Sequence, residues 1–507
     1  MKIVSVEQMR ALEAAAFDSG ISEAELQARA GRAVAEEIWR ARPGNGRVVI
    51  MVGHGNNGRD GGVAASWLLE HGVAVDLVLA PRHAITPEEL ANLRSLGASL
   101  TRSDDTAAVD RALNGAELAV DALAGIGARG ALREPLASLA QRLNAHRHEL
   151  TVVALDLPSG IDADTGEVPG EAVSANITVT LGGVKQGLLR FPAAERVGRL
   201  VARDIGIPPR AEVDVPYTVL QRSELGALVP ARALNAHKYR FGRVLVIAGS
   251  DHFLGAPVLC AGGASRVGAG LITVASTRDV RLNVAAHLPE ATFTQVDVRA
   301  DEGESAARGI EAYLQSHISA VIGPGLGRGD AKTSFVAETL RLRPQGHHVV
   351  IDADGLVALA EMPDWPRRLG PNAILTPHTG ELARLVGHEL DETEPDWQRA
   401  GRLAQKWGCV LVAKGPFTAI AAADGRVDVW PHANPALATG GTGDVLAGII
   451  AGFLAQGLST WDAARLAVGV HGLAAARVVE RGWRTLLASD LFDELPAVLG
   501  ALVTRRR

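Results

Sequence analysis

The chain has 507 residues, too many for one hydrophobic core, and it therefore predicts two domains of roughly 200 to 300 residues each. Its 51 basic and 57 acidic side chains give a net charge of −6 without a long basic stripe, which argues against nucleic acid as a partner. The N-terminus lacks an apolar signal core, and the longest uncharged run, 445–461, is too polar for a membrane span. The two cysteines suggest neither disulfides nor zinc, so we expect a cytoplasmic protein that binds no membrane.

The first half of the chain alternates strand-like and helix-like segments. A helix is expected from the capping sequence at Ser22 to about Trp39. The expected strands are 48–52, 73–79, 118–121 and 152–156, and the further expected helices are 62–71 and 88–96. This alternation predicts a mostly parallel sheet with helices on both faces, that is, a Rossmann-like three-layer α/β/α domain.

The proline-rich stretch 206–216 is the predicted linker, and it divides the chain into domains 1–212 and 213–507. A second α/β series follows it. Its expected strands are 243–248, 271–275, 320–322, 349–352, 374–376 and 410–413, and its expected helices are 444–455 and 461–480. Because ligands of open parallel sheets bind beyond the carboxyl ends of the strands, the polar residues that follow these strands are the candidate site residues.

A glycine-rich stretch follows the first of these strands. Gly53, Gly55 and Gly58 have the G-x-G-x-x-G spacing of loops that bind a dinucleotide pyrophosphate. However, Asp60 would repel a diphosphate, and Asp76, the candidate ribose-binding acid, stands inside a strand rather than at its end. These two features disfavour an ordinary hydride-transfer Rossmann site.

Polar clusters after three strands suggest an oxygen-rich pocket instead. Asn57, Asp121 and Ser159 supply side-chain oxygens of the kind that hard cations prefer. Ordinary turn chemistry is the alternative for each cluster taken alone, because turns are rich in glycine, asparagine, aspartate and serine. Three such clusters in one domain favour a site.

Other residues in this domain could complete the site. Gly125, Gly127 and Gly130 form a loop able to offer backbone N–H groups to a phosphate. Asp156, at a strand end, could act as an acid/base or hold a hydroxyl. Lys185 follows a strand in a glycine-rich segment and is either a site cation or a surface lysine.

The stretches GHGNNGRDGG, DALAGIG and ALDLPSGIDADTG resemble the epimerase half of the bifunctional NAD(P)H-hydrate repair enzymes, which interconverts the R and S hydrates of NADH and NADPH (NADHX and NADPHX). The resemblance implies a potassium ion at Asn57, Asp121 and Ser159. Arg59 departs from the family pattern, which has glycine there. The implied substrate contacts are Asn56, Asn57, Gly58, Arg59, Asp60, Gly125, Ile126, Gly127, Ala128, Arg129, Gly130, Ala131 and Asp156.

The strongest local signal of the second half is the run 434–444, which leads into an apolar helix. Gly440, Gly441 and Gly443 expose backbone N–H groups to an anion at the helix N-terminus, where the helix dipole adds to the attraction. Asp444 could act as a base on a hydroxyl that attacks a phosphoryl group. An aspartate that caps the helix is the alternative, but three glycines exceed what capping needs. This pairing of anion hole and base resembles the ribokinase-like fold.

Polar residues follow several other strands of this half. Lys414 could neutralise nucleotide phosphates, although it could also be a surface lysine. The glycines of 323–327 allow a ligand to approach closely, and His378 is either a ligand contact or a structural histidine. Asp352 and Asp354 could hold a cation or shape the pocket. The chain lacks a Walker A sequence, which disfavours a P-loop kinase.

The stretches HKYRFGRVLVIAGS, GPGLG, TPHTGE, AKG and NPALATGGTGDVLAGIIAG resemble the dehydratase domain of the same repair enzymes. The resemblance implies ADP-dependent dehydration of the S hydrate, with Mg²⁺ on the phosphates. The implied substrate contacts are Ala256, Gly325, His378 and Asp444, and the implied nucleotide contacts are Lys414, Gly415, Pro416, Phe417, Thr418 and Gly443.

The expected mechanism of the second half makes a poor leaving group into a good one. Asp444 would help the hydrate's hydroxyl attack the terminal phosphoryl of ADP, and phosphate would then leave. Two alternatives stay open: a small-molecule hydroxyl kinase fused to a nucleotide-binding module, and a first domain that binds ligands without catalysis. A homo-oligomer is expected, although its size does not follow from the sequence.

Overall fold

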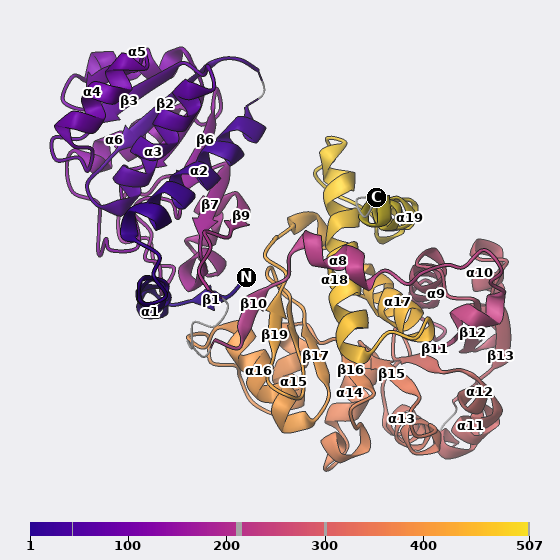
Figure 1. Cartoon of the computed structure of the whole chain (residues 1–507). Coiled ribbons are helices and arrows are strands. Elements are labelled where there is room, and N and C mark those ends of the chain that lie inside the picture. Colours follow the sequence, from indigo (N-terminus) through magenta and orange to yellow (C-terminus); the bar gives the residue numbers. More distant parts are fainter. Residues whose placement is uncertain (43, 209–214, 299–301, 505–507) are drawn as a thin grey trace. The chain divides into compact units, whose positions relative to one another are not determined.

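The computed structural model describes residues 1–42, 44–208, 215–298 and 302–504. The chain forms two compact units, Met1–Val219 and Leu220–Arg507 (Figure 1). The predicted boundary between residues 212 and 213 lies outside the described residues and stays a prediction. Over the described part of the chain, the structure contains no helix with the length and apolar character needed to cross a bilayer.

The first unit has a parallel sheet in the order β4-β3-β2-β5-β6-β7-β9, and a separate parallel pair formed by β1 and β8. Its strands are β1 Ile3–Val4, β2 Arg47–Val52, β3 Val75–Leu79, β4 Ser99–Arg102, β5 Ala116–Ala122, β6 Thr151–Leu155, β7 Ile177–Leu181, β8 Val184–Lys185, β9 Arg199–Arg203 and β10 Tyr217–Val219. Its α-helices are α1 Val6–Asp18, α2 Glu23–Ala41, α3 Asn56–Glu70, α4 Pro87–Ser95, α5 Thr106–Asn114, α6 Leu136–His146 and α7 Ala194–Val197.

Alternation along β2 shows that both faces of this sheet are covered. Val48, Ile50 and Val52 belong to one hydrophobic cluster, which includes residues of α2 and α3. Val49 and Met51 belong to another cluster, which includes residues of α5 and α6. Since neighbouring side chains of a strand point to opposite faces, the unit has three layers, and the predicted α/β/α architecture is confirmed.

Helix α3 begins at Asn56, six residues before the predicted start at residue 62. The glycines of this stretch suggested a loop because glycine weakens helices. In the structure the glycines serve close packing: a Cβ on Gly58 would lie 2.2 Å from the carbonyl oxygen of Gly53. The residues from Asn56 to Asp60 therefore lie in the first turns of a helix that starts directly beyond β2.

The second unit has a mixed sheet that runs in the order β19-β18-β17-β16-β15-β14-β11-β12-β13, antiparallel at β17–β18 and β18–β19 and parallel elsewhere. Its strands are β11 Arg243–Ile247, β12 Leu271–Ser276, β13 Thr292–Gln295, β14 Ser319–Ile322, β15 His348–Ile351, β16 Ala373–Leu375, β17 Val410–Ala413, β18 Ala419–Ala421 and β19 Val427–Val429. Its α-helices are α8 Arg222–Leu228, α9 Ala256–Arg266, α10 Arg278–His287, α11 Gly303–Gly309, α12 Glu311–Ser316, α13 Asp330–Leu342, α14 Asp354–Ala360, α15 Thr379–Val386, α16 Asp396–Trp407, α17 Thr442–Ala455, α18 Thr460–Glu480 and α19 Leu491–Thr504.

Helices α9 and α17 pack unusually closely in this unit, and α18 packs beside α17 (Figure 1). A Cβ on Gly448 of α17 would lie 1.9 Å from the carbonyl oxygen of Cys260 in α9, and one on Gly263 would lie 2.5 Å from that of Val445. Both cysteines of the chain are buried, and burial raises the pKa of each thiol, that of Cys409 to about 12. The close helix contact fixes the start of α17, which carries Asp444.

Candidate active sites

The first unit contains a cavity of 520 Å³ beyond the carboxyl ends of its central strands. The predicted site residues that line it come from the start of α3, the loop after β5, and the ends of β6 and β8. They are Asn56, Asn57, Asp60, Gly125, Ile126, Gly127, Ala128, Asp156 and Lys185. The structure therefore brings together, from separate segments, most of the residues predicted to form the site of the first unit.

Five predicted contact residues do not line this cavity. Gly58 packs against the backbone of Gly53, directly after β2, and Arg59 extends toward Glu23, with 3.7 Å between Nη1 and Oε1. The stretch 129–131 is exposed and is not part of the cavity wall. Gly58 can still act through the close approach that it allows, but it offers no side chain to a ligand.

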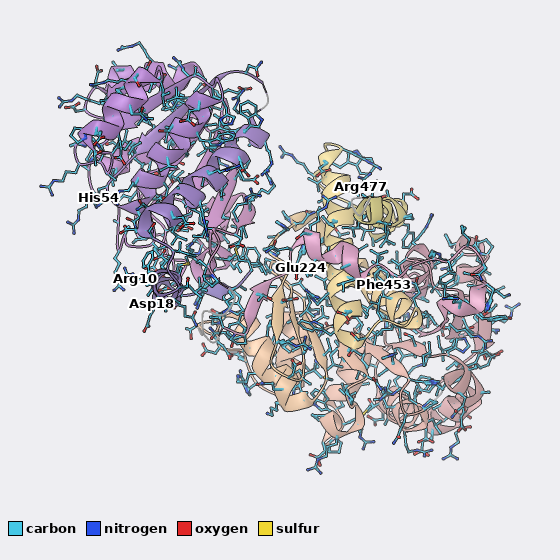
Figure 2. All side chains as sticks on the ribbon, viewed as in Figure 1. Arg10, Asp18, His54, Glu224, Phe453 and Arg477 are labelled. Carbon is cyan, nitrogen blue, oxygen red and sulfur yellow. The ribbon has the colours of Figure 1, made fainter. Side chains whose placement is uncertain are left out.

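Helices α1 and α2 form a wall that the sequence analysis missed. Arg10, labelled in Figure 2, comes from α1, and His54, also labelled there, precedes α3. Helix α1 is held at the site because the strand before it pairs with β8, with Ile3 opposite Val184. Two-residue strands leave almost no pattern in a sequence; the apolar spacing of 6–16 could have indicated the helix but not its position. The other missed lining residues are Met9, Glu13, Phe17, Glu23, Leu26, Gln27, Ala30, Gly55, Ala124, Leu181 and Ile205.

Asp156 and Lys185 form an ion pair at the base of the cavity. Lys185 is 1% exposed, and its ammonium donates to Asp156 Oδ1 and to the carbonyl of Leu181 (2.9 Å). The same carboxylate oxygen accepts the N–H of Leu181 at 3.1 Å. Asp156 has a φ of +67°, a strained conformation that costs a non-glycine residue about 1 kcal/mol or more. Lys185 is thus a buried cation that lines the cavity and not a surface lysine.

Two further carboxyl groups face this pair. Asp60 in α3 is buried; burial, and then the charges of Asp156 and Glu13, raise its pKa well above the usual value. Burial also raises the pKa of Glu13 in α1, although Lys185 opposes this shift. Oδ1 of Asp60 is buried and has no hydrogen-bond partner among the described residues. Both shifts are toward the protonated form, and the shift of Asp60 is the larger one.

Asn57, Asp121 and Ser159 meet around the backbone of Ala124. The Ser159 hydroxyl donates to Asp121 Oδ1 at 2.6 Å and accepts the N–H of Ala124 at 2.9 Å, while Asn57 Nδ2 donates to the Ala124 carbonyl at 2.9 Å. Asp121 is fully buried, and among the described residues it forms no ion pair with a basic side chain. Burial raises its pKa to about 6, although the hydrogen bonds from Ser159 lower it.

Asp444 lies in the first turn of α17, one residue after Gly443 and three after the helix cap Gly441. Burial, followed by the charge of Asp352, raises the pKa of its carboxyl to about 7, against the opposing effect of Lys414. A carboxylate that titrates near neutral pH can accept a proton from a hydroxyl and release it again. The first backbone N–H groups of the helix point at whatever occupies the space before it.

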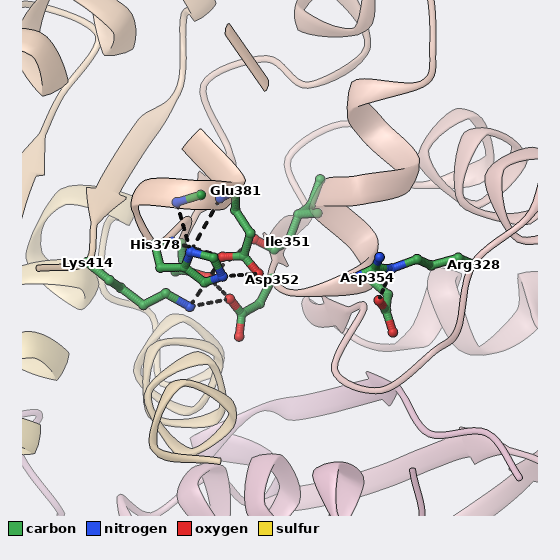
Figure 3. Close-up of polar contacts among 9 residues, drawn as sticks. Arg328, Ile351, Asp352, Asp354, His378, Glu381 and Lys414 are labelled. Atoms are coloured by element: carbon green, nitrogen blue, oxygen red, sulfur yellow. Dashed lines mark hydrogen bonds and ion pairs between the residues drawn. The ribbon is translucent and has the colours of Figure 1, made fainter. Parts of the chain in front are cut away.

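Lys414, after β17, extends toward the carboxylates of Asp352 and Glu381 (Figure 3). Its Nζ donates to Asp352 Oδ1 at 2.8 Å and lies 3.9 Å from Glu381 Oε2. A Cβ on Gly443 would lie 3.1 Å from the same Nζ, so the glycine leaves room for the ammonium. Burial lowers the pKa of Lys414, but Asp352 and Glu381 outweigh it, and the net shift is upward. Lys414 is thus a fixed positive charge beside Gly443.

The remaining predicted residues of this unit have different surroundings. His378 is exposed and caps α15, where its Nδ1 accepts the N–H of Gly380 at 3.0 Å. Asp354 receives hydrogen bonds from Gly327 N–H (3.0 Å) and Arg328 Nε (3.1 Å), apart from the Lys414 group in Figure 3. Asp354 therefore shapes the loop after β14, one of the two roles considered from the sequence.

Ala256 and Gly325 adjoin each other, since a Cβ on Gly325 would lie 3.1 Å from that of Ala256. Ala256 begins α9, whose Leu259 contacts Gly441. In the stretch 414–418, the Thr418 hydroxyl donates to the Gly415 carbonyl at 3.2 Å, and Gly415 and Pro416 are exposed. The predicted contacts of the second unit therefore gather along one edge of its sheet.

The geometry of the two units defines a two-domain α/β enzyme, with an acid-lined cavity in one unit and a helix-start anion site in the other. The family model described as NAD(P)H-hydrate dehydratase matches residues 244–497, and the model described as YjeF-related protein N-terminus matches residues 23–187. The chain belongs to the family of bifunctional NAD(P)H-hydrate repair enzymes, which combine an epimerase and a dehydratase.

Individual relatives agree with this assignment. The chain is 38% identical to the bifunctional NAD(P)H-hydrate repair enzyme Nnr of Coxiella burnetii, over 96% of this chain and 97% of that protein. It is also 38% identical to the enzyme of the same name from Moorella thermoacetica, over 94% and 92% of the two chains. The solved structure of a ribokinase-like superfamily protein from Enterococcus faecalis covers 57% of this chain and 96% of its own, with 26% identity and a TM-score of 0.51. The predicted ribokinase-like fold is thereby confirmed.

Proposed function

We propose that the first unit interconverts the R and S hydrates of NADH and NADPH, and that the second unit dehydrates the S hydrate at the expense of ADP. The single observation that carries the second assignment is Asp444, a carboxyl with a pKa of about 7 at the glycine-rich start of α17 beside Lys414. It unites a base, an anion-binding helix start and a fixed cation, which are the parts needed to phosphorylate a hydroxyl.

In the proposed reaction, Asp444 accepts the proton of the substrate hydroxyl while that oxygen attacks the terminal phosphoryl group of ADP. The first amides of α17, including that of Gly443, and the ammonium of Lys414 hold the charge of the transferred group. The ring nitrogen then expels phosphate, and loss of a ring proton restores the dihydropyridine double bond. Hydroxide leaves poorly, and phosphorylation removes this obstacle.

The other predicted contacts receive roles from their positions. Ala256, Gly325 and His378 would contact the hydrate, and the stretch 414–418 would contact the nucleotide. Exposed backbone at Gly415 and Pro416 supports this, because it leaves the loop open to a ligand. The capping bond fixes the ring of His378 through Nδ1 and turns Nε2 toward Glu381 Oε1, at 3.5 Å.

Mg²⁺ would be held largely by the phosphates. Among the described residues, no three His, Cys, Asp or Glu side chains come together as a metal-binding group. Asp352 and Asp444 flank the place of the phosphates, and Mg²⁺ commonly takes one or two carboxylates together with phosphate oxygens. When bound, the ion would shield the phosphate charges.

A potassium ion is proposed for the first unit at Asn57, Asp121 and Ser159. The support is Asp121, a fully buried carboxyl that forms no ion pair among the described residues and is bonded to the Ser159 hydroxyl, while Ser159 and Asn57 both contact the backbone of Ala124. Potassium would neutralise that charge and fix the loop 125–128, which lines the cavity.

The same cavity supports the substrate contacts proposed for the first unit. The cavity is lined from α3 by Asn56, Asn57 and Asp60. It is also lined by residues 125–128 of the loop after β5 and by Asp156, directly after β6. The ion pair with Lys185 supports a role for Asp156 in holding a substrate hydroxyl rather than in exchanging protons. Substrate contacts from outside the cavity wall are proposed for Gly58, Arg59 and the stretch 129–131.

One experiment tests both activities. The full-length protein is given hydrated NADH as mixed epimers, with ADP, with ATP, or with neither, and recovery of dihydronicotinamide absorbance is followed. Full recovery with ADP is expected. Recovery that stops at the S fraction, apart from slow spontaneous epimerisation, would contradict the epimerase assignment, and a stable phosphorylated product would favour a hydroxyl kinase.

Two further expectations have no structural counterpart and stay predictions. The protein is expected to act in the cytoplasm, where its coenzyme substrates arise, and to form a homo-oligomer. Cell fractionation tests the first, and light scattering of the purified protein tests the second.

A further inference from the structure

The cavity of the first unit contains more negative groups than its cations can neutralise. Glu13 from α1, Asp60 from α3 and Asp156 beyond β6 all line it, together with the ammonium of Lys185. Lys185 is bonded to Asp156. The three carboxyl groups come from three different elements, so their meeting is a property of the fold and not of one sequence motif.

The nearby arginines do not remove this imbalance. Arg59 extends toward the exposed Glu23, at 3.7 Å, and Arg10 is exposed on α1. Arg10 lines the cavity, but both guanidinium groups are open to solvent, which screens their charges. Asp60, which is buried, and Glu13, which is half-buried, line the same cavity, where two ionised carboxylates would repel each other. One proton on the pair relieves this repulsion.

Asp60 is the better placed of the two to keep a proton. It is 8% exposed, and its Oδ1 has no hydrogen-bond partner among the described residues although it lines a cavity. A buried oxygen without a partner normally costs stability, which points to a group that binds the substrate. Burial and the charges of Asp156 and Glu13 raise the pKa of Asp60, while Arg59 and Lys185 oppose the shift more weakly.

Glu13 completes the pair from the opposite element. Burial raises its pKa; Lys185 and Arg10 lower it, and Asp156 and Glu23 raise it. The pairing of β1 with β8 positions the helix that carries Glu13, and a hydrogen bond from Val6 N–H to Asp164 Oδ1 at 2.7 Å fixes the first turn of that helix. Glu13 lies outside the residues matched by the N-terminal family model, 23–187.

We propose that Asp60 and Glu13 are the proton-transfer pair of epimerisation, one carboxyl protonated and the other ionised, while Asp156 and Lys185 stay a charged pair that holds the substrate. This inference rests on the epimerase function proposed for the first unit. It names the acid and base that the reaction needs.

The chemical step balances without a further reactant. Asp60 gives its proton to the hydroxyl oxygen; the C–O bond breaks, its electron pair leaves with water, and the lone pair of the adjacent ring nitrogen forms a C=N bond. Water then adds to the other face of that carbon, the C=N electrons return to nitrogen, and Glu13 takes the proton. Proton exchange between the two carboxyl groups restores the starting state, and the reverse direction exchanges their roles.

The test uses the full-length protein and purified R hydrate without ADP, so that dehydration does not run, and follows the appearance of the S epimer by chromatography. Asp60→Asn and Glu13→Gln are each expected to lower the rate constant of epimerisation by about 10²- to 10⁴-fold. Matched controls on the same helices, Glu7→Gln on α1 and Glu70→Gln on α3, carry exposed carboxylates outside the cavity and should epimerise at the wild-type rate.

Three readouts separate a catalytic role from a structural one. Each variant should keep the wild-type circular dichroism and the wild-type urea unfolding transition of the first unit, which shows that this unit folds. The wild-type rate should be bell-shaped in pH, because one proton must reside on the pair, and Asp60→Glu should keep a measurable rate with a shifted profile. Infrared spectra should show a carboxylic-acid C=O band that Asp60→Asn removes.

Asp60→Asn or Glu13→Gln activity within about twofold of wild type, or an increase in KM with an unchanged kcat, would overturn the proposal. Absence of epimerisation by the wild-type protein above the spontaneous rate would instead contradict the proposed function of the whole unit.

Discussion

The two sites lie on similar α/β scaffolds but have opposite electrostatic character. Both lie where parallel strands end, as in other open α/β sheets. In the first unit, burial and the crowding of carboxyl groups raise the pKa of Asp60 and of Glu13, so that their pair holds a proton, and Lys185 compensates a single carboxylate. In the second unit, a helix start and Lys414 offer positive potential to an anion, beside one carboxyl that can act as base. The first unit thus offers acidic groups to a neutral hydroxyl, whereas the second unit offers positive electrostatic potential to a phosphoryl group.

The strongest test of this contrast is Asp444→Ala. Because the base of phosphoryl transfer is removed, dehydration of the S hydrate with ADP is expected to fall by about 10³-fold or more. Epimerisation of the R hydrate without ADP should be unchanged, since Asp444 belongs to the other unit. Dehydration at the wild-type rate in the folded variant would refute the mechanism.

Lys414→Met should have the next largest effect. Loss of the ammonium removes a charge that faces the phosphates, so the rate should fall by about 10²-fold and KM for ADP should rise. It also leaves Asp352, 1% exposed, without its cation, and the second unit should lose about 3 kcal/mol of stability. Steady-state kinetics and urea unfolding measure both effects. Lys406→Met, an exposed lysine on α16, is the matched control, and equal behaviour of the two variants would contradict the role of Lys414.

The pH dependence of dehydration distinguishes a base from a helix cap. Since the pKa of Asp444 is raised to about 7, the fraction of ionised carboxylate grows roughly tenfold per unit below that pH and then levels. The rate constant with saturating ADP should therefore rise through pH 7 and flatten above it. A rate that is flat from pH 5 to pH 8 would indicate that Asp444 only caps α17.

The smallest expected effect concerns His471, a residue of α18 that contacts the glycine-rich start of α17. Its Nε2 lies 3.0 Å from the carbonyl oxygen of Thr442, and burial lowers its pKa from 6.5 to about 4. The unfolded chain binds this proton below about pH 6.5 and the folded chain only below about pH 4, so stability falls as the pH decreases between these values, by roughly 3 kcal/mol.

The comparison with His471→Gln isolates this contribution. The wild-type protein should lose roughly 3 kcal/mol more stability than the variant between pH 6.5 and pH 4, measured by urea unfolding at each pH. Parallel pH curves for the two proteins would show that folding does not lower the pKa of His471.

The sequence predicted most of the parallel strands of both units, because apolar runs followed by glycine, asparagine and aspartate are typical of strand ends, but it missed β4, β7, β9 and β13. It also placed Asp156, Lys185, Lys414 and Asp444 correctly at strand ends or helix starts. Each of these residues adjoins an apolar strand or a glycine-rich stretch that can be recognised in the sequence. The topology of a parallel sheet brings such positions to one edge.

The parts that sequence could not predict depend on contacts between distant segments. Glu13 carries no motif, and it reaches the cavity through the pairing of two two-residue strands, β1 and β8. The start of α3 was misjudged because the glycines from Gly58 onward have low helix propensity, and tertiary packing against Gly53 overrides that preference. The pairing of Lys185 with Asp156 likewise depends on the turn between β7 and β8.

The contact between α9 and α17 has a consequence for inherited variation. The backbone of α17 at Gly448 nearly touches that of α9 at Cys260, about one turn beyond Asp444, and no room exists for one extra methyl group. An alanine there would look harmless by charge, polarity and size, yet it would force the two helices apart and tilt the catalytic carboxyl away from its hydroxyl. Changes that disable this enzyme should therefore include small, apolar ones in the interior, which never meet a ligand.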